Sequence, residues 1–543
     1  MRFDPHLTQG QLADRNSDVK WGPIPSTGTF LPRFNTESNE DATVQTKINW
    51  TPQQLAFHAC QDRKIRLIAF AGAAKSTSLI GYAQRYPKKR FLYLAFARSV
   101  ADEAKGKFPR SNVVCLSTHQ LAWKSFGKVY QHKMAPSLRL TAIAKALENN
   151  DWTFLRIVLD TLTNFLCSAS SEIDGSHLEP KHMEHIRRQS ATYYERVFTS
   201  AEEIWRRMID PEDLSIPMLH DGYLKRYVLS RPDLGHQFDG IFLDEAQDTN
   251  ALCVALLAAQ TIQVISVGDP HQAIFQFRKA ENAFDHEFFA DATTLNLTTS
   301  FRFGPATAHV ANLLLSLKGE TTKVIGGGAR TQIKTAIPGG TKKVTYINRT
   351  VMGVIETALH FASQNKRIYW VGKAEAYQIE DIADLFWLYV GDMDRIKNPR
   401  IGKEYQTFEK YAQVAEDTKD IEMNRALRIL TSQENLMAKI EHLRRMTVEK
   451  EEDADVVVTT AHRCKGLEWP NIQLMEDFPD PLDPEMTPED SVAEINLLYV
   501  ALTRGQLITV LNTVVIFLMR EAQRREVAAR QAAAKLGILD SYA

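Results

Sequence analysis

Cysteine is scarce in this sequence, and the few cysteines are not spaced for metal binding. Five occur among 543 residues, and no two of them form a CxxC pair: Cys60, Cys115, Cys167, Cys253 and Cys464. The spacing therefore predicts neither a zinc site nor a disulfide framework. It fits a reducing, intracellular setting, which means the cytoplasm or nucleoid for a bacterial or phage protein and the nucleus for a eukaryotic one.

Long apolar runs and an excess of charge of one sign are also missing. Residues 1–16 contain no apolar run after a basic start, so we expect no secretory signal. The most apolar stretch, 507–519, is too short and too polar for a membrane span and is interpreted as a core strand. The formal net charge of -1 does not indicate a nucleic-acid binder, although DNA binding requires only a local basic track.

Short apolar runs alternate with helix-like segments from about Trp50 onward. This is the pattern of parallel α/β sheets, and hydrophobic residues make up 44% of the chain, enough for buried cores. Two polar or charged helical stretches interrupt the alternation, so we predict two α/β cores, each with a mostly helical insertion. The predicted parts are a disordered tail at 1–45, a first core at 46–130 and 236–310 with its insertion at 131–235, a second core at 311–380 and 446–518 with a reduced insertion at 381–445, and a C-terminal helix or tail at 519–543.

An acidic pair follows one of the apolar runs. The string LDEAQD (243–248) comes directly after FDGIF (238–242), which places Asp244 and Glu245 at the C-terminal edge of a buried strand. Open α/β sheets bind ligands at this edge. Nucleotide hydrolysis needs one carboxylate for Mg²⁺ and another to polarise the attacking water, and adjacent acids can do both. The alternative is a solvated loop.

The segment IAFAGAAKSTSL (68–79) joins a predicted strand to a predicted helix and resembles a phosphate loop. Lys75 would contact the β- and γ-phosphates and the Ser76 hydroxyl would bind Mg²⁺. The loop departs from [AG]xxxxGK[ST], because Ala74 stands where the glycine before the lysine belongs. Some positions of such a loop favour φ > 0, where alanine costs on the order of 1 kcal/mol or more. A working nucleotide site, a degraded one and a plain strand–turn–helix all remain open. The predicted nucleotide-binding residues of the loop are Gly72, Ala73, Ala74, Lys75, Ser76 and Thr77.

Six strings occur in a recognisable order. They are HDGYLK (220–225), DEAQD (244–248), GDPHQAIFQFRKA (268–280), TTSFRFGP (298–305), TTAHRCKGLEW (459–469) and NLLYVALTRG (496–505). Together they resemble the UvrD/Rep-like superfamily 1 DNA helicases, most closely the F-box DNA helicase branch, over about residues 50–518. We find no F-box-like segment in the N-terminal tail, so we do not expect the ubiquitin-ligase role of that branch.

The resemblance implies two RecA-like P-loop NTPase domains that use ATP and Mg²⁺. It also implies 3'→5' movement on single-stranded DNA, or on DNA with a 3' single-stranded tail, in repair or recombination. No membrane partner is expected, and no protein partner is predicted. Cations from both cores would meet the charge that develops on the transferred phosphoryl group. By resemblance, the nucleotide would be contacted by Gln54 at the adenine edge, Phe301 on the base, Glu468 at the ribose, Arg302 at the γ-phosphate, and Arg504 as an arginine finger. Gln272 would be the sensor between the γ-phosphate and DNA.

The same resemblance implies DNA binding through aromatic stacking, which tolerates any sequence. For each aromatic residue, the alternative to DNA binding is packing in a core. For each histidine, the alternative is a structural role. The predicted DNA-binding residues are Phe96, Thr118, His119, Phe275, Phe277, Arg278, Thr460 and His462.

Three functions are therefore compared. The first is an active ATP-dependent translocase and helicase. The second is an ATPase-impaired pseudo-helicase that grips single-stranded DNA or a repair partner, which the unusual loop favours. Four residues argue against the pseudo-helicase, because a protein that only binds does not need all of them together. They are Asp244, Glu245, Arg302 and Arg504. A helicase–nuclease is disfavoured, since no additional cluster of acids and lysine follows the motor.

Overall fold

The computed structural model describes residues 48–95, 98–275, 282–398, 401–418, 421–432 and 434–535. The chain divides after Lys47 into two units, and all of the described residues belong to the second. The predicted tail at 1–45 and the predicted DNA contacts Phe96, Phe277 and Arg278 lie outside the described residues.

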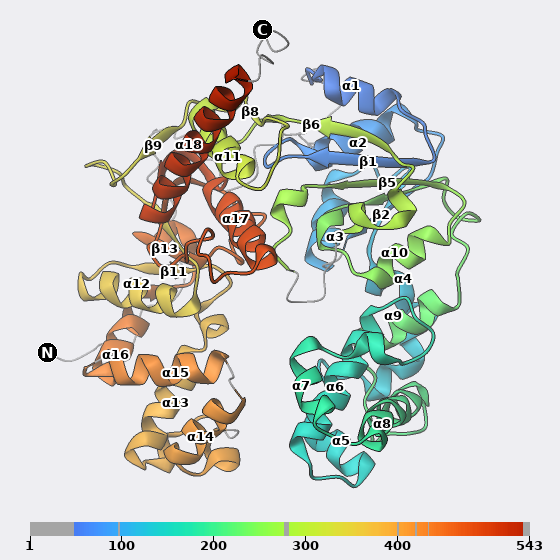
Figure 1. The fold of residues 1–543 in the computed structure, drawn as a ribbon, viewed down its shortest axis with the longest axis vertical. Helices are drawn as coiled ribbons and strands as arrows, with labels where there is room; N and C mark the ends of the chain where they lie inside the picture. Colours follow the sequence, from blue (N-terminus) through green and yellow to red (C-terminus); the bar gives the residue numbers. More distant parts are fainter. Residues whose placement is uncertain are drawn as a thin grey trace, which may run out of the picture. The chain divides into compact units, whose positions relative to one another are not determined.

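The first core is built on a six-stranded parallel sheet with the strand order β3-β2-β4-β5-β1-β6. Figure 1 labels strands β1, β2, β5 and β6 of this sheet. Every residue of β2, β4 and β5 is buried, as expected of a sheet that is covered on both faces. Because β1 pairs with both β5 and β6, the segments that follow these three strands emerge next to one another. The elements are α1 (Pro52–Ala59), β1 (Lys64–Ala69), α2 (Lys75–Arg85), β2 (Phe91–Ala95), α3 (Arg98–Lys107), β3 (Val113–Ser117), β4 (Gly240–Leu243), α10 (Ala251–Ala258), β5 (Gln263–Gly268) and β6 (Thr293–Leu297).

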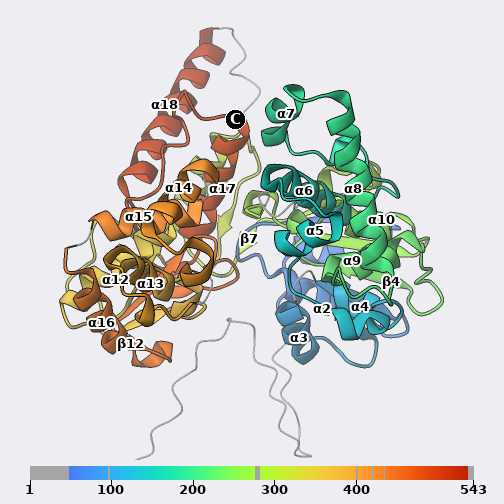
Figure 2. The same cartoon turned by 90° about the horizontal axis from the view of Figure 1, so that it is seen from below.

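A helical insertion lies between β3 and β4. Helices α6 and α8 pack side by side around their buried apolar faces (Figure 2). Lys225, in the HDGYLK string, is fully buried in this insertion, and its ammonium donates to the carbonyls of Phe165 and Ser168, both at 2.8 Å, closing the end of α6. The elements are α4 (Thr118–Trp123), α5 (Leu140–Leu147), α6 (Trp152–Cys167), α7 (Pro180–Arg187), α8 (Ala191–Ile209) and α9 (His220–Leu229).

The second core contains a seven-stranded parallel sheet with the order β12-β11-β13-β10-β14-β15-β9, and its own helical insertion lies between β11 and β12. Two short strands, β7 and β8, pair where the chain passes from the first core to the second. Strand β7 (Thr299–Ser300) follows the sheet of the first core. The elements of the second core are α11 (Pro305–Ser316), β8 (Ile325–Gly326), β9 (Gln332–Lys334), β10 (Val344–Asn348), α12 (Val351–Ser363), β11 (Ile368–Trp370), the insertion helices α13 (Ile379–Val390), α14 (Phe408–Thr418), α15 (Ile421–Ser432) and α16 (Leu436–Met446), then β12 (Thr447–Val448), β13 (Val456–Thr460), β14 (Trp469–Leu474), α17 (Pro488–Leu502), β15 (Gly505–Val510) and α18 (Thr513–Lys535).

The predicted α/β class, with parallel sheets flanked by helices, is confirmed. One local prediction is wrong: the stretch 507–519 is not a single core strand, because β15 ends at Val510 and α18 begins at Thr513. Asn512 separates the two, since its side-chain oxygen accepts the N–H of Val515 at 3.0 Å in the manner of a helix cap. Val515, Leu518 and Ala522 are buried, which is helical spacing. Across the part of the chain that the structure describes, no helix is long and apolar enough to cross a membrane.

Candidate nucleotide and DNA site

The loop between β1 and α2 has two residues with left-handed backbone. Gly72 has φ 74°, and Ala74 has φ 58° and ψ 45°. The sequence predicted that the loop would need φ > 0 near Ala74, and the structure adopts this conformation with alanine in place. Left-handed backbone costs a non-glycine residue roughly 1–2 kcal/mol, so the surroundings must hold the loop in shape.

Contacts from distant segments supply that support. The Phe301 N–H donates to the Gly72 carbonyl at 2.9 Å, and the Ala71 N–H donates to the Tyr499 hydroxyl at 3.1 Å. A β-carbon on Gly72 would lie 2.4 Å from Ser300 Oγ, so only glycine allows the TTSFRFGP segment to pass this close. The loop is thus pinned from both the first and the second core.

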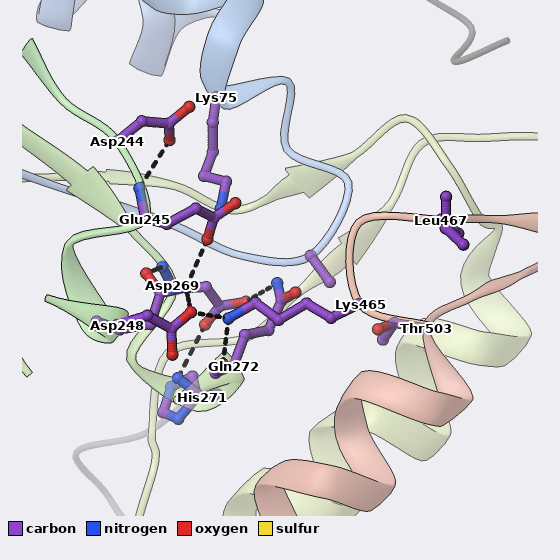
Figure 3. A network of polar contacts seen from close by, with 12 residues as sticks. Lys75, Asp244, Glu245, Asp248, Asp269, His271, Gln272, Lys465, Leu467 and Thr503 are labelled. Atoms are coloured by element: carbon purple, nitrogen blue, oxygen red, sulfur yellow. Dashed lines mark hydrogen bonds and ion pairs between the residues drawn. The ribbon is translucent and has the colours of Figure 1, made fainter. Parts of the chain in front are cut away.

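The acidic pair faces this loop (Figure 3). Lys75, the first residue of α2, forms an ion pair with Glu245 at 2.7 Å. Asp244 accepts a hydrogen bond from the Tyr93 hydroxyl of the neighbouring strand at 2.6 Å. Glu245 is itself left-handed, with φ 52°, so a second strained residue lies opposite Ala74. Strain of this kind is concentrated at functional sites because ordinary packing does not reward it.

Burial and mutual attraction shape the protonation of these groups. Burial opposes the charged form of Lys75, but the carboxylates of Glu245 and Asp244 outweigh it and raise the Lys75 pKa. Burial likewise opposes ionised Glu245, yet the Lys75 and Lys465 ammonium groups prevail and lower its pKa. Burial, together with the Glu245 charge, raises the pKa of Asp244. The two acids are therefore inequivalent, and Glu245 is the more acidic of the pair.

Two arginines approach from either side of the cores' junction. Arg302, after β7, pairs with Glu468 at 2.5 Å and donates to the Thr503 carbonyl at 3.2 Å. Arg504, after α17, is 1% exposed and donates to Gln272 Oε1 at 3.1 Å. Burial lowers the pKa of Arg504 to about 10, and the nearby Arg302 charge acts in the same direction. The structure brings the two predicted phosphate-contacting arginines together with Gln272 and Glu468.

The residues predicted to contact the base touch the loop or the helix after it. Gln54 forms a capping box with Thr51 at the start of α1, and its amide donates to Ser78 Oγ on α2 at 3.0 Å. Phe301 is 45% exposed. An exposed ring fixed to the loop through its own backbone suits stacking on a planar ligand.

The chemistry of the site fits a phosphate ligand with Mg²⁺. The first N–H groups of α2 have no acceptor within the helix, and Thr77 Oγ1 is buried without a hydrogen-bond partner among the described residues. Ser76 and Asp244 offer a hydroxyl and a carboxylate, and Mg²⁺ typically takes one or two such protein ligands besides phosphate and water. No group of three or more His, Cys, Asp or Glu in the described ranges could hold a metal ion without such a ligand.

A cavity of about 1200 Å³ lies beside the acids and is lined by both cores. Of the predicted DNA contacts, Phe275, Thr460 and His462 line it. The Phe275 and His462 rings are 6.4 Å apart, and the Lys465 ammonium lies 5.3 Å from the Phe275 ring. The cavity reaches Asp244 and Glu245, so one space connects the predicted DNA-stacking surface with the predicted catalytic acids.

The two other predicted DNA contacts in the first core do not line this cavity. Thr118 is 3% exposed at the first turn of α4. His119 pairs with Asp221 at 3.1 Å and lies edge-on to the His220 and Tyr223 rings. These contacts fit the structural alternative, in which the histidine joins α4 to α9.

Several residues of the site were missed by the sequence analysis. Lys465 pairs with Asp248 and donates to the Gln272 carbonyl at 2.7 Å, tying the second core to the first. Gln247, Asp269 and Tyr499 are buried in the same network. All of these stand inside the six strings, so position within a string was the available signal. The insertion arginines Arg425 and Arg428, together with Arg463, also line the cavity, and no motif marked the first two.

Comparisons with known proteins agree with these observations. Two family models match the chain in succession: the UvrD/REP helicase N-terminal domain at residues 116–292 and the UvrD-like helicase C-terminal domain at residues 263–511. The chain is 31% identical to F-box DNA helicase 1 of Gallus gallus over 508 residues, which covers 85% of this chain and 48% of that protein. It is 26% identical to F-box DNA helicase protein 1 of Schizosaccharomyces pombe over 508 residues, covering 85% of this chain and 57% of that protein. The chain thus spans about half the length of the curated relatives it matches.

Proposed function

Because the chain belongs to the UvrD/Rep family of superfamily 1 DNA helicases, we propose that it is an ATP-driven motor that moves 3'→5' along single-stranded DNA and separates duplex strands. Its cellular role under this proposal is DNA repair or recombination. The observation that carries the proposal is the ion pair between Lys75 and Glu245 beside a phosphate loop that is left-handed at Ala74. Ala74 thus adopts the positive φ that such a loop favours, although it is not glycine.

The side chains divide the work of hydrolysis as follows. Lys75 and the N–H groups at the start of α2 bind the phosphates of ATP, with Phe301 and Gln54 at the base and Glu468 at the ribose. Glu245, the more acidic of the pair, orients the attacking water and accepts its proton. Ser76 and Asp244 would hold Mg²⁺, which neutralises charge on the phosphates.

Arg302 and Arg504 stabilise the charge that develops on the transferred group. In this structure both are bonded within the protein, to Glu468 and to Gln272. Reaching the phosphates requires these bonds to be exchanged, which moves the second core relative to the first. The same rearrangement would alter the cavity that contains Phe275 and His462, and this is how hydrolysis would drive movement on DNA.

ATP turnover with and without single-stranded DNA tests the proposal. We expect DNA to stimulate turnover, and Lys75→Ala to reduce it by roughly a hundredfold or more through the loss of a preorganised cation. Lys88→Ala is the matched control, because Lys88 is exposed just after α2. Absence of turnover in wild-type protein with DNA would reject the motor.

The second candidate is a pseudo-helicase that binds single-stranded DNA without turnover. It is favoured by the alanine in the left-handed position, which carries a conformational cost that glycine would not. This candidate requires salt-dependent DNA binding that Lys75→Ala leaves unchanged, together with no ATP hydrolysis.

A further inference from the structure

The Tyr499 hydroxyl lies where the second core touches the phosphate loop of the first. Tyr499 is on α17 and is fully buried. Its hydroxyl accepts the N–H of Ala71 at 3.1 Å and donates to Asp269 Oδ2 at 3.2 Å. Ala71 follows β1 and Asp269 follows β5, and these two strands are paired. The single Tyr499 hydroxyl is therefore hydrogen-bonded to the segments that follow two adjacent strands.

From Asp269 the hydrogen bonds continue in two directions. In one, Gln272 Nε2 donates to Asp269 at 2.7 Å and Gln272 Oε1 accepts from Arg504 at 3.1 Å. In the other, the Asp269 N–H donates to Gln247 Oε1 at 3.0 Å, and the Gln247 amide donates to Glu245 at 2.5 Å. Asp269 is thus the buried junction between the catalytic acid, the arginine finger and, through Tyr499, the phosphate loop.

The hydroxyl is suited to this place because it must accept one hydrogen bond and donate another. Burial and the Asp269 charge raise the Tyr499 pKa well above its ordinary value, so the proton stays on the oxygen. A buried group that loses its partner is left unpaired at a cost, since no water replaces the bond. Both hydrogen bonds therefore depend on where α17 lies.

Tyr499 and Arg504 are both attached to the C-terminal end of α17. The Arg504 N–H donates to the Ala501 carbonyl at 3.2 Å and its Nε donates to the Val500 carbonyl at 2.8 Å, which fix the arginine to the end of α17. A displacement of α17 that frees Arg504 from Gln272 must also change the distance from Tyr499 to Ala71.

The DNA side is linked to the same junction. Lys465 lines the cavity that contains the predicted stacking residues, and it donates to the Gln272 carbonyl at 2.7 Å. The Gln272 side chain is therefore hydrogen-bonded to Asp269 and Arg504, and its backbone carbonyl is hydrogen-bonded to Lys465.

We propose that Tyr499 is a positioning residue that couples the shape of the phosphate loop to the DNA cavity, through Asp269 and Gln272. The inference rests on the proposed function only for its ligands, ATP and single-stranded DNA. Occupation of the loop by nucleotide changes DNA affinity through this hydroxyl, and DNA changes nucleotide affinity by the same factor.

Tyr499→Phe tests the coupling, because it keeps the ring and removes only the oxygen. The measurement is the affinity for a labelled oligothymidylate with and without a non-hydrolysable ATP analogue. We expect the analogue to change wild-type DNA affinity by roughly five- to 150-fold, the usual range of coupling between two sites. In Tyr499→Phe the ratio should fall to within about twofold of one, while each ligand alone binds within about threefold of wild type. DNA-stimulated turnover should drop roughly tenfold, the effect of one unpaired buried donor.

Two further variants separate coupling from general damage. Tyr130→Phe is the matched control, since Tyr130 is also fully buried but donates to the Ile209 carbonyl at 2.8 Å within the first insertion. It should keep the wild-type ratio. Asp269→Asn should lose the ratio as Tyr499→Phe does, and the double variant should lose no more than either, because both act through one hydrogen bond.

The outcomes distinguish this inference from the motor itself. A wild-type ratio in Tyr499→Phe, a ratio of one in wild type, or an equal loss in Tyr130→Phe would each overturn the coupling. Coupling in wild type that disappears in Tyr499→Phe, without any ATP turnover, would support the relay and reject the motor.

Discussion

Restoring glycine at position 74 addresses the most unusual feature of the chain. Ala74 has left-handed backbone, which costs a non-glycine residue roughly 1–2 kcal/mol, and Ala74→Gly removes that cost. Glycine also increases the conformational entropy of the unfolded chain, and this offsets about 0.4–1 kcal/mol of the stabilisation of the folded state. We therefore expect Ala74→Gly to raise the free energy of unfolding by on the order of 0.5–1 kcal/mol.

Its effect on catalysis should be small. The N–H groups of the loop are already directed by a left-handed residue and pinned by Phe301 and Tyr499. Turnover in Ala74→Gly should then stay within about threefold of wild type, less than 0.7 kcal/mol in the barrier. The assays are urea unfolding of the whole chain and DNA-stimulated ATP hydrolysis.

Two neighbouring variants calibrate these assays. Ala73→Gly is the matched control, because Ala73 is buried and has ordinary backbone, so glycine there should lower stability by roughly 0.5–1 kcal/mol. Ala74→Val places a β-branched residue at φ > 0, and should distort the loop and lower turnover more than about tenfold. A tenfold or larger rise in turnover in Ala74→Gly would refute the reasoning, because it would mean that the natural loop is impaired.

Three more predictions follow from the structure. Phe301→Ala should raise the KM for ATP roughly ten- to hundredfold by removing about 1–3 kcal/mol of base stacking, with little change in unfolding because the ring is exposed; an unchanged KM would contradict the stacking role. Arg428→Ala should lower the magnitude of the slope of log affinity for single-stranded DNA against log salt concentration by about 0.7, the value for one phosphate contact. Arg520→Ala, at an exposed position of α18, should leave this slope unchanged. Equal slopes in Arg428→Ala and wild type would exclude Arg428 from the DNA surface. Lys225→Met should lower stability by on the order of 1–3 kcal/mol by leaving buried carbonyls unpaired. Burial lowers the pKa of Lys225 from 10.5 to about 8, so between these pH values the unfolded chain binds more protons than the folded chain. The contribution of Lys225 to the free energy of unfolding therefore rises with pH across that window. The loss of stability in Lys225→Met, measured by urea unfolding, should grow from about pH 8 to 10.5, and a loss that is constant with pH would contradict the assignment.

Local patterns in the sequence predict the two sheets well. Short apolar runs separated by helical segments specify parallel strands, and the acids and the phosphate loop follow such runs directly, so their place at strand ends could be predicted. The failure at 507–519 has a local cause. Periodicity in an apolar run is ambiguous between strand and helix, and Asn512 decided it by capping α18.

What could not be predicted depends on contacts between distant parts of the chain. The left-handed conformation of Ala74 is held from Phe301 and Tyr499, which lie hundreds of residues away. Glu468 and Arg302 were assigned separate nucleotide roles, and their ion pair appears only once the two cores meet. Arg428 belongs to no motif, because an insertion helix contributes it to a cavity formed mainly by the cores.

Directional movement on DNA tests the central claim most directly. Single-stranded oligonucleotides carrying a streptavidin-bound biotin at either the 5' or the 3' end would be incubated with the protein, ATP and Mg²⁺, and release of streptavidin measured. We expect rapid release from the 5' end only, dependent on ATP and lost in Lys75→Ala. Tight DNA binding without release from either end, or release from the 3' end, would contradict it.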